Sequence, residues 1–190
     1  GAIVNVAQSA GITMAADYAA TVDSGTATVA QALILDAATT GAITATISNG
    51  DLTTLTALTD ANGNNALTIT LTDTSADAAD LNTVAAITSV VVDATAVTTI
   101  TGTADAIVNV AQSAGIMTAA DYAATVNAGT ANVTQALILE TATTGMITAD
   151  ITEGDLATLT TLTDANTNNA LTITVTGPSA DAADLNTVAA

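Results

Sequence analysis

The sequence predicts an α/β repeat solenoid in which short parallel strands alternate with short helices. Residues 105–190 repeat residues 1–86 at an offset of 104 positions without a gap, and 67 of the 86 pairs are identical. Within one repeat, segments with strand periodicity alternate with segments of helical spacing. Successive strand segments start at Ile43, Leu67 and Ser89. This spacing leaves room for the crossover connection of a dozen or more residues that parallel pairing needs.

The repeat also sets the expected domain organisation. Residues 1–104 form repeat unit 1, and residues 105–190 form repeat unit 2, truncated at its C-terminal end. We therefore expect the chain to be a window from a longer tandem array, whose modules bury their apolar faces against their neighbours. The alternative architecture is an all-β solenoid without helices, with Thr ladders along its faces.

Helical spacing and capping residues indicate several short helices. Ala2–Ala10 is one, and Gly11 is expected to end it in a left-handed conformation. In the second copy Thr103 can cap the same helix, with Asp105 in its first turn. Ala15–Val22 is a second candidate helix.

The later segments of the repeat combine both periodicities. Val29–Ala38 fits either a buried strand or a helix. Ser48–Asp51 resembles a capping box for a helix over Asp51–Ala61, with a stripe of leucines three residues apart. Ser75 is expected to cap the helix that follows it. The predicted strands are Ile43–Ser48, Leu67–Thr72 and Ser89–Ala94, with a short extension at Thr98–Gly102.

The composition is acidic and dominated by small residues. Ala contributes 45 residues and Thr 41, while 18 carboxylates face no Lys, Arg or His, so the formal charge is −18. A mean hydropathy of +0.55 and dispersed acids indicate an ordered chain. Nucleic acid is excluded as a direct partner because phosphate binding depends on Lys and Arg. No apolar run reaches the 18 or so residues of a membrane-spanning helix, so no membrane insertion is expected.

Catalytic chemistry has few candidate residues. Without His, Cys or Lys, only paired carboxylates remain for acid and base work. Asp77 and Asp80, repeated as Asp181 and Asp184, are three residues apart on a predicted helix. Carboxylates in a first helical turn are better explained by the helix dipole. We expect no catalytic residues and no enzyme activity.

A partial calcium-loop motif occurs once in each copy. The D-x-N-x-N pattern places oxygen ligands at alternate positions, as a hard cation requires. The Gly expected next is Asn65, and the bidentate acid would be Leu71, so the motif is incomplete. A helix stop is the structural alternative, and diffuse calcium or magnesium binding to the acidic surface is the other cation-binding alternative. The candidate ligands are Asp60, Asn62 and Asn64, with Asp164, Asn166 and Asn168 in the second copy.

Alternating threonines form a further pattern. Thr-x-Thr pairs occur at Thr44 and Thr46, at Thr68 and Thr70, and at Thr172 and Thr174. Regular arrays of this kind are similar to ice-binding surfaces, but Asp150 replaces Thr46 in the second copy and interrupts the array. The β-branched side chain of Thr favours strands, which is the simpler explanation.

One stretch carries a family resemblance. The run LTITLTDTSADAADLNTVAAITSVVVDATAVTTITGTADAIVNV, Leu67–Val110, resembles tandem repeats in giant secreted cell-surface proteins of cyanobacteria and some other bacteria. The match recurs over Leu171–Ala190. Here AAIT stands where the family has a DGKT-like turn. The resemblance implies an extracellular, repetitive, structural or adhesive polypeptide, and it supplies no catalytic residues.

Together these patterns predict a structural role. We expect a repeat segment of an extracellular microbial filament, sheath or surface layer that assembles with itself head to tail or continues in the same tandem array. Calcium is the one candidate cofactor. The alternative function is a spacer or stalk in a large calcium-dependent surface adhesin. The absence of Lys and Arg leaves trypsin-like proteases no site to cleave, which suits an exposed location.

Overall fold

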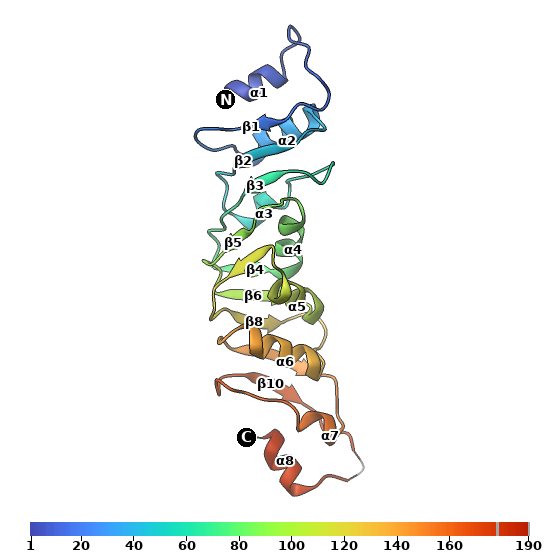
Figure 1. Cartoon of the computed structure of the whole chain (residues 1–190). Helices are drawn as coiled ribbons and strands as arrows, with labels where there is room; N and C mark the ends of the chain where they lie inside the picture. The colour runs from blue at the N-terminus through green and yellow to red at the C-terminus, as the bar shows by residue number, and fades with distance from the viewer. Residues whose placement is uncertain (178, 190) are drawn as a thin grey trace. The chain divides into compact units, whose positions relative to one another are not determined.

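The computed structural model is an α/β protein whose parallel strands alternate with short helices (Figure 1). It describes residues 1–177 and 179–189; Pro178 and Ala190, both within the predicted second repeat unit, lie outside the described residues. The helices exclude the all-β alternative. Contacts divide the chain into two compact units. The first comprises Gly1–Asp73, Asp80–Ala96 and Ala114–Met117, and the second Thr74–Ala79, Val97–Ser113 and Thr118–Ala190.

The first unit contains a three-stranded parallel sheet in the order β1-β2-β3. A second, two-stranded sheet pairs β5 with β7. The elements that lie wholly or mostly in this unit are α1 (Ala2–Ala7), β1 (Ala20–Thr21), α2 (Val29–Ala38), β2 (Ile43–Thr46), α3 (Leu52–Leu55), β3 (Ala66–Thr68), α4 (Ala78–Ala86), β5 (Val92–Ala94) and β7 (Ile116–Thr118).

The second unit is organised around a five-stranded sheet in the order β10-β9-β8-β6-β4, with parallel neighbours. Its helices, except the last, come between consecutive strands of this sheet, so each crossover returns the chain to the same direction. The elements are β4 (Ser75–Asp77), β6 (Thr99–Gly102), α5 (Ala104–Gln112), β8 (Ala123–Val126), α6 (Val133–Ala142), β9 (Ile147–Ile151), α7 (Leu156–Leu159), β10 (Ala170–Ile173) and α8 (Ala182–Val188).

Secondary structure recurs with the period of the sequence. Helices α2 and α6 occupy positions 104 residues apart from first to last residue, and so do α3 and α7. Strands β2 and β9 start at Ile43 and Ile147, and β3 and β10 start at Ala66 and Ala170. The 19 differences between the copies therefore leave the order of elements unchanged across this part of the repeat.

Two expectations for the start of the repeat are wrong. The predicted helix Ala15–Val22 is instead a turn followed by β1, and its counterpart in the second copy contains β8. Pairing with the neighbouring strand overrides the helical spacing of small residues here. Helix α1 ends at Ala7 with Gln8 in a right-handed conformation, and Gly11 is not among the residues with positive φ. The predicted left-handed cap does not form.

The helix starts show which capping residues the sequence identified. Thr103 accepts a hydrogen bond from the amide of Ala106 at 3.2 Å, as predicted, and Asp105 lies in the first turn. Val29–Ala38 is a helix, because Thr28 and Gln31 form a capping box ahead of a buried apolar face.

The capping predictions at Ser48–Asp51 and Ser75 are wrong. Asp51 is itself the N-cap of α3 and accepts from the amide of Thr54 at 2.9 Å. Helix α3 is only one turn long, although Leu52, Leu55 and Leu58 are all buried as expected. Ser75 lies in β4, and Asp77 instead accepts from the amide of Ala79 at 2.9 Å.

The core alternates small and large side chains across the sheets. Buried alanines lie beside Ile or Leu on the neighbouring parallel strand, where strands are about 4.8 Å apart, and of these partners Leu171 is half-buried and the others are buried. An alanine beside a branched side chain leaves that chain the space to reach the helix layer. The pairs are Ala20 with Ile43, Ala45 with Leu67, Ala76 with Ile100, Ile100 with Ala124, Ala124 with Ile147, and Ala149 with Leu171.

A close backbone approach explains one glycine in each repeat. A Cβ atom on Gly41 would lie 2.4 Å from the carbonyl oxygen of Tyr18, and one on Gly145 would lie 2.2 Å from that of Tyr122. The buried Thr39 hydroxyl donates to the Tyr18 carbonyl at 2.5 Å and accepts from the amide of Gly41 at 2.9 Å. Only glycine fits this junction without moving the backbone.

Asn65 is a buried polar residue that connects several segments of the first unit. Its side-chain oxygen accepts from the amide of Ile43 at 3.1 Å, and its side-chain nitrogen donates to the carboxylate of Asp36 at 3.0 Å. Its own amide donates to Asp60 at 2.9 Å. Only 1 % of Asn65 is exposed, so these bonds replace water entirely. Asn169 makes the equivalent bonds to Ile147, Glu140 and Asp164.

Replacing Asn65 should destabilise the protein strongly. Asn65→Ala leaves the buried amide of Ile43 and the carboxylate of Asp36 without this partner, and we expect a loss of about 2–3 kcal/mol in the free energy of unfolding. Asn62→Ala in the neighbouring exposed turn is the matched control and should change stability by less than about 0.5 kcal/mol. Chemical denaturation of both variants measures the difference; equal stabilities would contradict the role assigned to Asn65.

Candidate functional site

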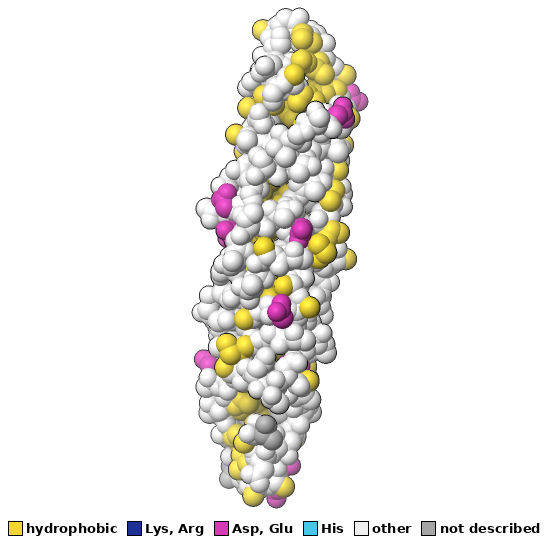
Figure 2. Space-filling view, turned by 90° about the vertical axis from the view of Figure 1, so that its left-hand side faces the viewer, with side chains coloured by type: hydrophobic (Ala, Val, Ile, Leu, Met, Phe, Trp, Pro, Cys, Tyr) yellow, Lys and Arg dark blue, Asp and Glu magenta, His cyan; other side chains and the backbone are white. Residues whose placement is uncertain are grey.

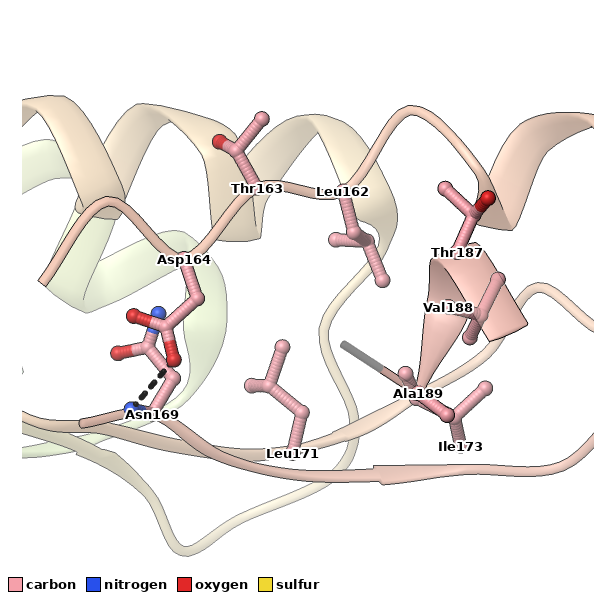
Figure 3. Close-up of a pocket in the computed structure, with 9 residues that line it drawn as sticks. All are labelled: Leu162, Thr163, Asp164, Asn169, Leu171, Ile173, Thr187, Val188 and Ala189. Carbon is pink, nitrogen blue, oxygen red and sulfur yellow. Dashed lines mark hydrogen bonds between the residues drawn. The ribbon is translucent and has the colours of Figure 1, made fainter. Parts of the chain in front are cut away.

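A cavity of about 340 Å³ lies at β10 and α8 in the second unit. Figure 3 shows Leu162 and Leu171 pointing toward one another across it, with Thr187, Val188 and Ala189 on the other side. We call this cavity the β10 groove. Its lining residues are Leu162, Thr163, Asp164, Asn169, Leu171, Ile173, Thr187, Val188 and Ala189.

The β10 groove exposes side chains whose counterparts in the first repeat are buried. Leu58, Leu67, Ile69 and Val84 are at most 4 % exposed. Their equivalents Leu162, Leu171, Ile173 and Val188 are all half-buried. In addition, β10 is the end strand of its sheet, so its outer edge has no neighbouring strand among the residues that the structure describes. The groove therefore combines an apolar floor with an open strand edge.

The predicted calcium ligands lie in a turn that is closed by its own hydrogen bonds. One carboxylate oxygen of Asp60 accepts from the amide of Asn64 at 3.2 Å, and the other accepts from the amide of Asn65 at 2.9 Å. The Asn64 side chain donates to the carbonyl of Thr40 at 3.0 Å. Asn62 is exposed and Gly63 has a φ of +68°. Asp60 thus supports the backbone of a helix stop.

The second copy repeats this turn. Asp164 accepts from the amides of Asn168 and Asn169 at 3.2 and 3.0 Å, and the Asn168 side chain donates to the carbonyl of Thr144 at 3.1 Å. Asn166 is half-buried in the turn, and Thr167 adopts a φ of 54° where the first copy has glycine. Within residues 1–177 and 179–189 no group of three or more acidic side chains is placed to hold a metal ion.

The paired carboxylates weighed as catalytic residues lie at helix starts. Asp77 accepts from the amide of Ala79, and Asp181 accepts from the amide of Ala183 at 2.8 Å as the N-cap of α8. Asp80 and Asp184 lie in the first turns of α4 and α8. Their positions match the interaction of an acid with the free amides and the dipole of a helix N-terminus.

Threonines on the strands form short lateral pairs. Thr21 lies beside Thr44, and Thr46 lies beside Thr68, on the exposed face of the three-stranded sheet. In the second unit Asp150 lies beside Thr172, and Ala170 lies beside Thr148. Asp150 interrupts a regular threonine array, as the sequence predicted, and Ala170 does so at the same place as its identical counterpart Ala66 beside Thr44.

Carboxylates without side-chain cations are held by hydrogen bonds. The hydroxyl and amide of Thr54 lower the pKa of Asp51, and the amide and hydroxyl of Thr158 lower that of Asp155. The hydroxyl of Thr95 donates to Asp93 at 2.7 Å and lowers its pKa in the same way. On the face drawn in Figure 2 the acidic side chains lie in a few small groups that are separated from one another. This separation limits the repulsion among the acids.

Sequence reasoning missed several polar residues that join one segment to another. Asn49 accepts from the amide of Val29 at 3.0 Å, and its replacement Glu153 accepts from the amide of Val133 at 3.1 Å. Asp73 accepts from the amide of Leu52 at 2.6 Å. These positions vary between the copies, a pattern that by itself is typical of exposed residues. One feature of the sequence could have indicated this role: Asn49 and Glu153 differ in residue type, but both have a side-chain oxygen that can accept a hydrogen bond.

The two tyrosines carry buried hydroxyl groups. Neither the Tyr18 nor the Tyr122 hydroxyl has a hydrogen-bond partner within the described part of the chain. Tyr122 is fully buried, and burial raises the pKa of its phenol. Since an unpaired buried hydroxyl costs free energy, the aromatic ring rather than the hydroxyl accounts for the packing role of this residue.

Comparison with known proteins finds no match to any protein-family model, curated protein or solved structure. The resemblance to secreted repeat proteins therefore stays a prediction. No helix among the described residues has the length and apolar character needed to cross a membrane.

The lowered pKa of Asp51 predicts a specific pH dependence. Because the folded state lowers this pKa, the charged carboxylate stabilises the fold above the unfolded pKa of about 3.9, and that contribution is lost as the pH falls through the folded pKa. Asp51→Asn keeps a capping oxygen that does not titrate. The stability difference between wild type and Asp51→Asn should therefore change between pH 5 and pH 2, measured by urea denaturation. The exposed Asp23→Asn variant is the control. If the stability difference between wild type and Asp51→Asn stays constant over this pH range, the cap contributes no charge-dependent stability.

Proposed function

We propose that this chain is a structural repeat segment of an extracellular microbial filament, sheath or surface layer. In this proposal the repeats stack head to tail as an α/β solenoid, through continuation of the tandem array or through a second copy of the chain. The observation that carries it is the recurrence of the same helices and strands 104 residues apart. Such modules cover their apolar faces with a neighbouring module.

The chemistry of the side chains supports a passive role. The chain has no His, Cys, Lys or Arg, and its acids at helix starts bind backbone amides. Open strand edges favour addition of another chain, and contacts that join unlike ends generate fibres. The lack of basic residues, which removes the cleavage sites of trypsin-like proteases, supports an exposed extracellular location.

Assembly of the full chain tests this proposal. We expect purified protein at rising concentration to form threads of uniform width in negative-stain electron micrographs, with a matching increase in sedimentation coefficient. As a control, the Thr53→Ser variant changes an exposed residue outside the β10 groove and should assemble like the wild type. A monodisperse monomer at every concentration and salt condition would contradict the filament. It would favour the spacer or stalk role.

Divalent cations should stabilise the protein without a dedicated cage. The 18 carboxylates repel one another with no side-chain cation to offset them, so calcium or magnesium near the surface should raise the thermal midpoint at low salt. A chelator should reverse the gain, and about 0.5 M sodium chloride should reduce it by screening. Asp60→Asn and Asp164→Asn should keep most of the calcium response. Complete loss of the response in these variants would indicate bound calcium in the loops, and no response in wild type would contradict cation stabilisation.

A further inference from the structure

The last part of repeat unit 1, Ile87–Ala104, is here called the bridging segment. In the first unit its beginning lies along the outer edge of β3. The Thr88 hydroxyl donates to the carbonyl of Leu67 at 2.8 Å and accepts from the amide of Leu67 at 2.8 Å. The amide of Ser89 donates to the carbonyl of Asn65 at 2.9 Å.

The contact continues beyond the end of β3. The amide of Asp93 donates to the carbonyl of Ile69 at 3.0 Å, and the amide of Leu71 donates to the carbonyl of Asp93 at 2.8 Å. Thr70 and Asp93 form a parallel bridge. The bridging segment thus satisfies the main chain of one strand edge and covers the leucines beneath it, including Leu67, which is 1 % exposed.

The β10 groove is the uncovered form of this same surface. Its nine lining residues are identical to their first-repeat counterparts Leu58, Thr59, Asp60, Asn65, Leu67, Ile69, Thr83, Val84 and Ala85. The side chains are the same, yet the apolar ones are more exposed in the second copy. In the first copy the bridging segment lies beside these residues and bonds the main chain of Leu67.

We propose that the β10 groove binds a segment with the sequence of Thr88–Asp93, presented by a further repeat, in the register seen on β3. The main chain of Leu171 would take the place of that of Leu67, with the carbonyls of Asn169 and Ile173 in place of those of Asn65 and Ile69. This proposal rests on the proposed function, since stacking is what brings a further repeat to the groove.

The open hydrogen-bonding edge of β10 favours an added strand over a small apolar ligand. A compact apolar molecule could cover Leu162, Leu171 and Val188, but it would leave the outer edge of β10 without hydrogen-bond partners. An added strand supplies both contacts at once: backbone hydrogen bonds give affinity and alternate side chains fill the apolar floor. We assign this second purpose to Val92, which is fully buried in the first unit and precedes Asp93, whose main chain bonds Ile69 and Leu71.

A synthetic peptide with the sequence of Ile87–Gly102 tests the proposal on the full chain. We expect saturable binding by calorimetry and a rise of about 5 °C in the thermal midpoint at saturation. Hydrogen exchange should slow at the amides of Leu171 and Val175. A peptide with Val92→Asp buries an unpaired charge, and one with Thr88→Val loses both bonds to the Leu171 main chain; each should bind at least about tenfold more weakly. A scrambled peptide is the composition control.

Other outcomes overturn the proposal. Three results would each assign the groove a different role. The first is equal binding of the Val92→Asp peptide, and the second is protection of residues near Ile12 in place of β10. The third is binding of a small apolar molecule without any binding of the peptide. A chain extended by the bridging-segment sequence provides a second measurement, because its added residues should protect the same β10 amides. Peptide binding without threads in electron micrographs would leave this inference standing and contradict the filament. Threads without peptide binding would support the filament and contradict this inference.

Discussion

The structure depends on the alternation of alanine with Ile or Leu between neighbouring parallel strands. Strands about 4.8 Å apart bring equivalent side chains close together, so an alanine beside a branched residue leaves that residue more space beneath the helices. Ile151 beside Ile173 in the five-stranded sheet is an exception. Ala20 beside Ile43 and Ala124 beside Ile147 show the same solution in both copies. This constraint explains why a protein with a buried core contains so much alanine and no Phe or Trp.

Because the core is built largely from small side chains, much of the specificity of the fold comes from polar contacts. Asn65 and Asn169 each join three segments of the chain through hydrogen bonds, and their loss would leave main-chain groups unsatisfied. Because the chain has no basic side chains, its carboxylates bind backbone amides instead. Carboxylates cap α3, α7 and α8 in this way. The acidic composition is thus partly structural, because many helices here begin with an acid that binds its own first turn.

The two copies of the repeat act as an internal comparison. Identical side chains at Leu67 and Leu171 are buried in one copy and half-buried in the other, and the difference follows from the strand that lies over the first. The start of the repeat shows the same dependence on a neighbour. Ile116 belongs to β7 and is 7 % exposed where β5 pairs with it, whereas its counterpart Ile12 lies outside any strand and is 49 % exposed. Each module therefore acquires part of its structure from the segment beside it.

The sequence by itself determined the alternation of parallel strands with short helices, the period of 104 residues and the strands from Ile43 and Leu67, because these follow from local periodicity and from repetition. It also identified the Thr103 cap, which depends only on residues within one turn. Tertiary structure decided the rest. Ala15–Val22 became a turn and a strand because Ala20 pairs with Ile43, and Asp60 bonds the turn amides of Asn64 and Asn65. The exposure of the β10 groove was decided by tertiary structure, since identical residues are buried or half-buried in the two copies according to the segment that lies beside them.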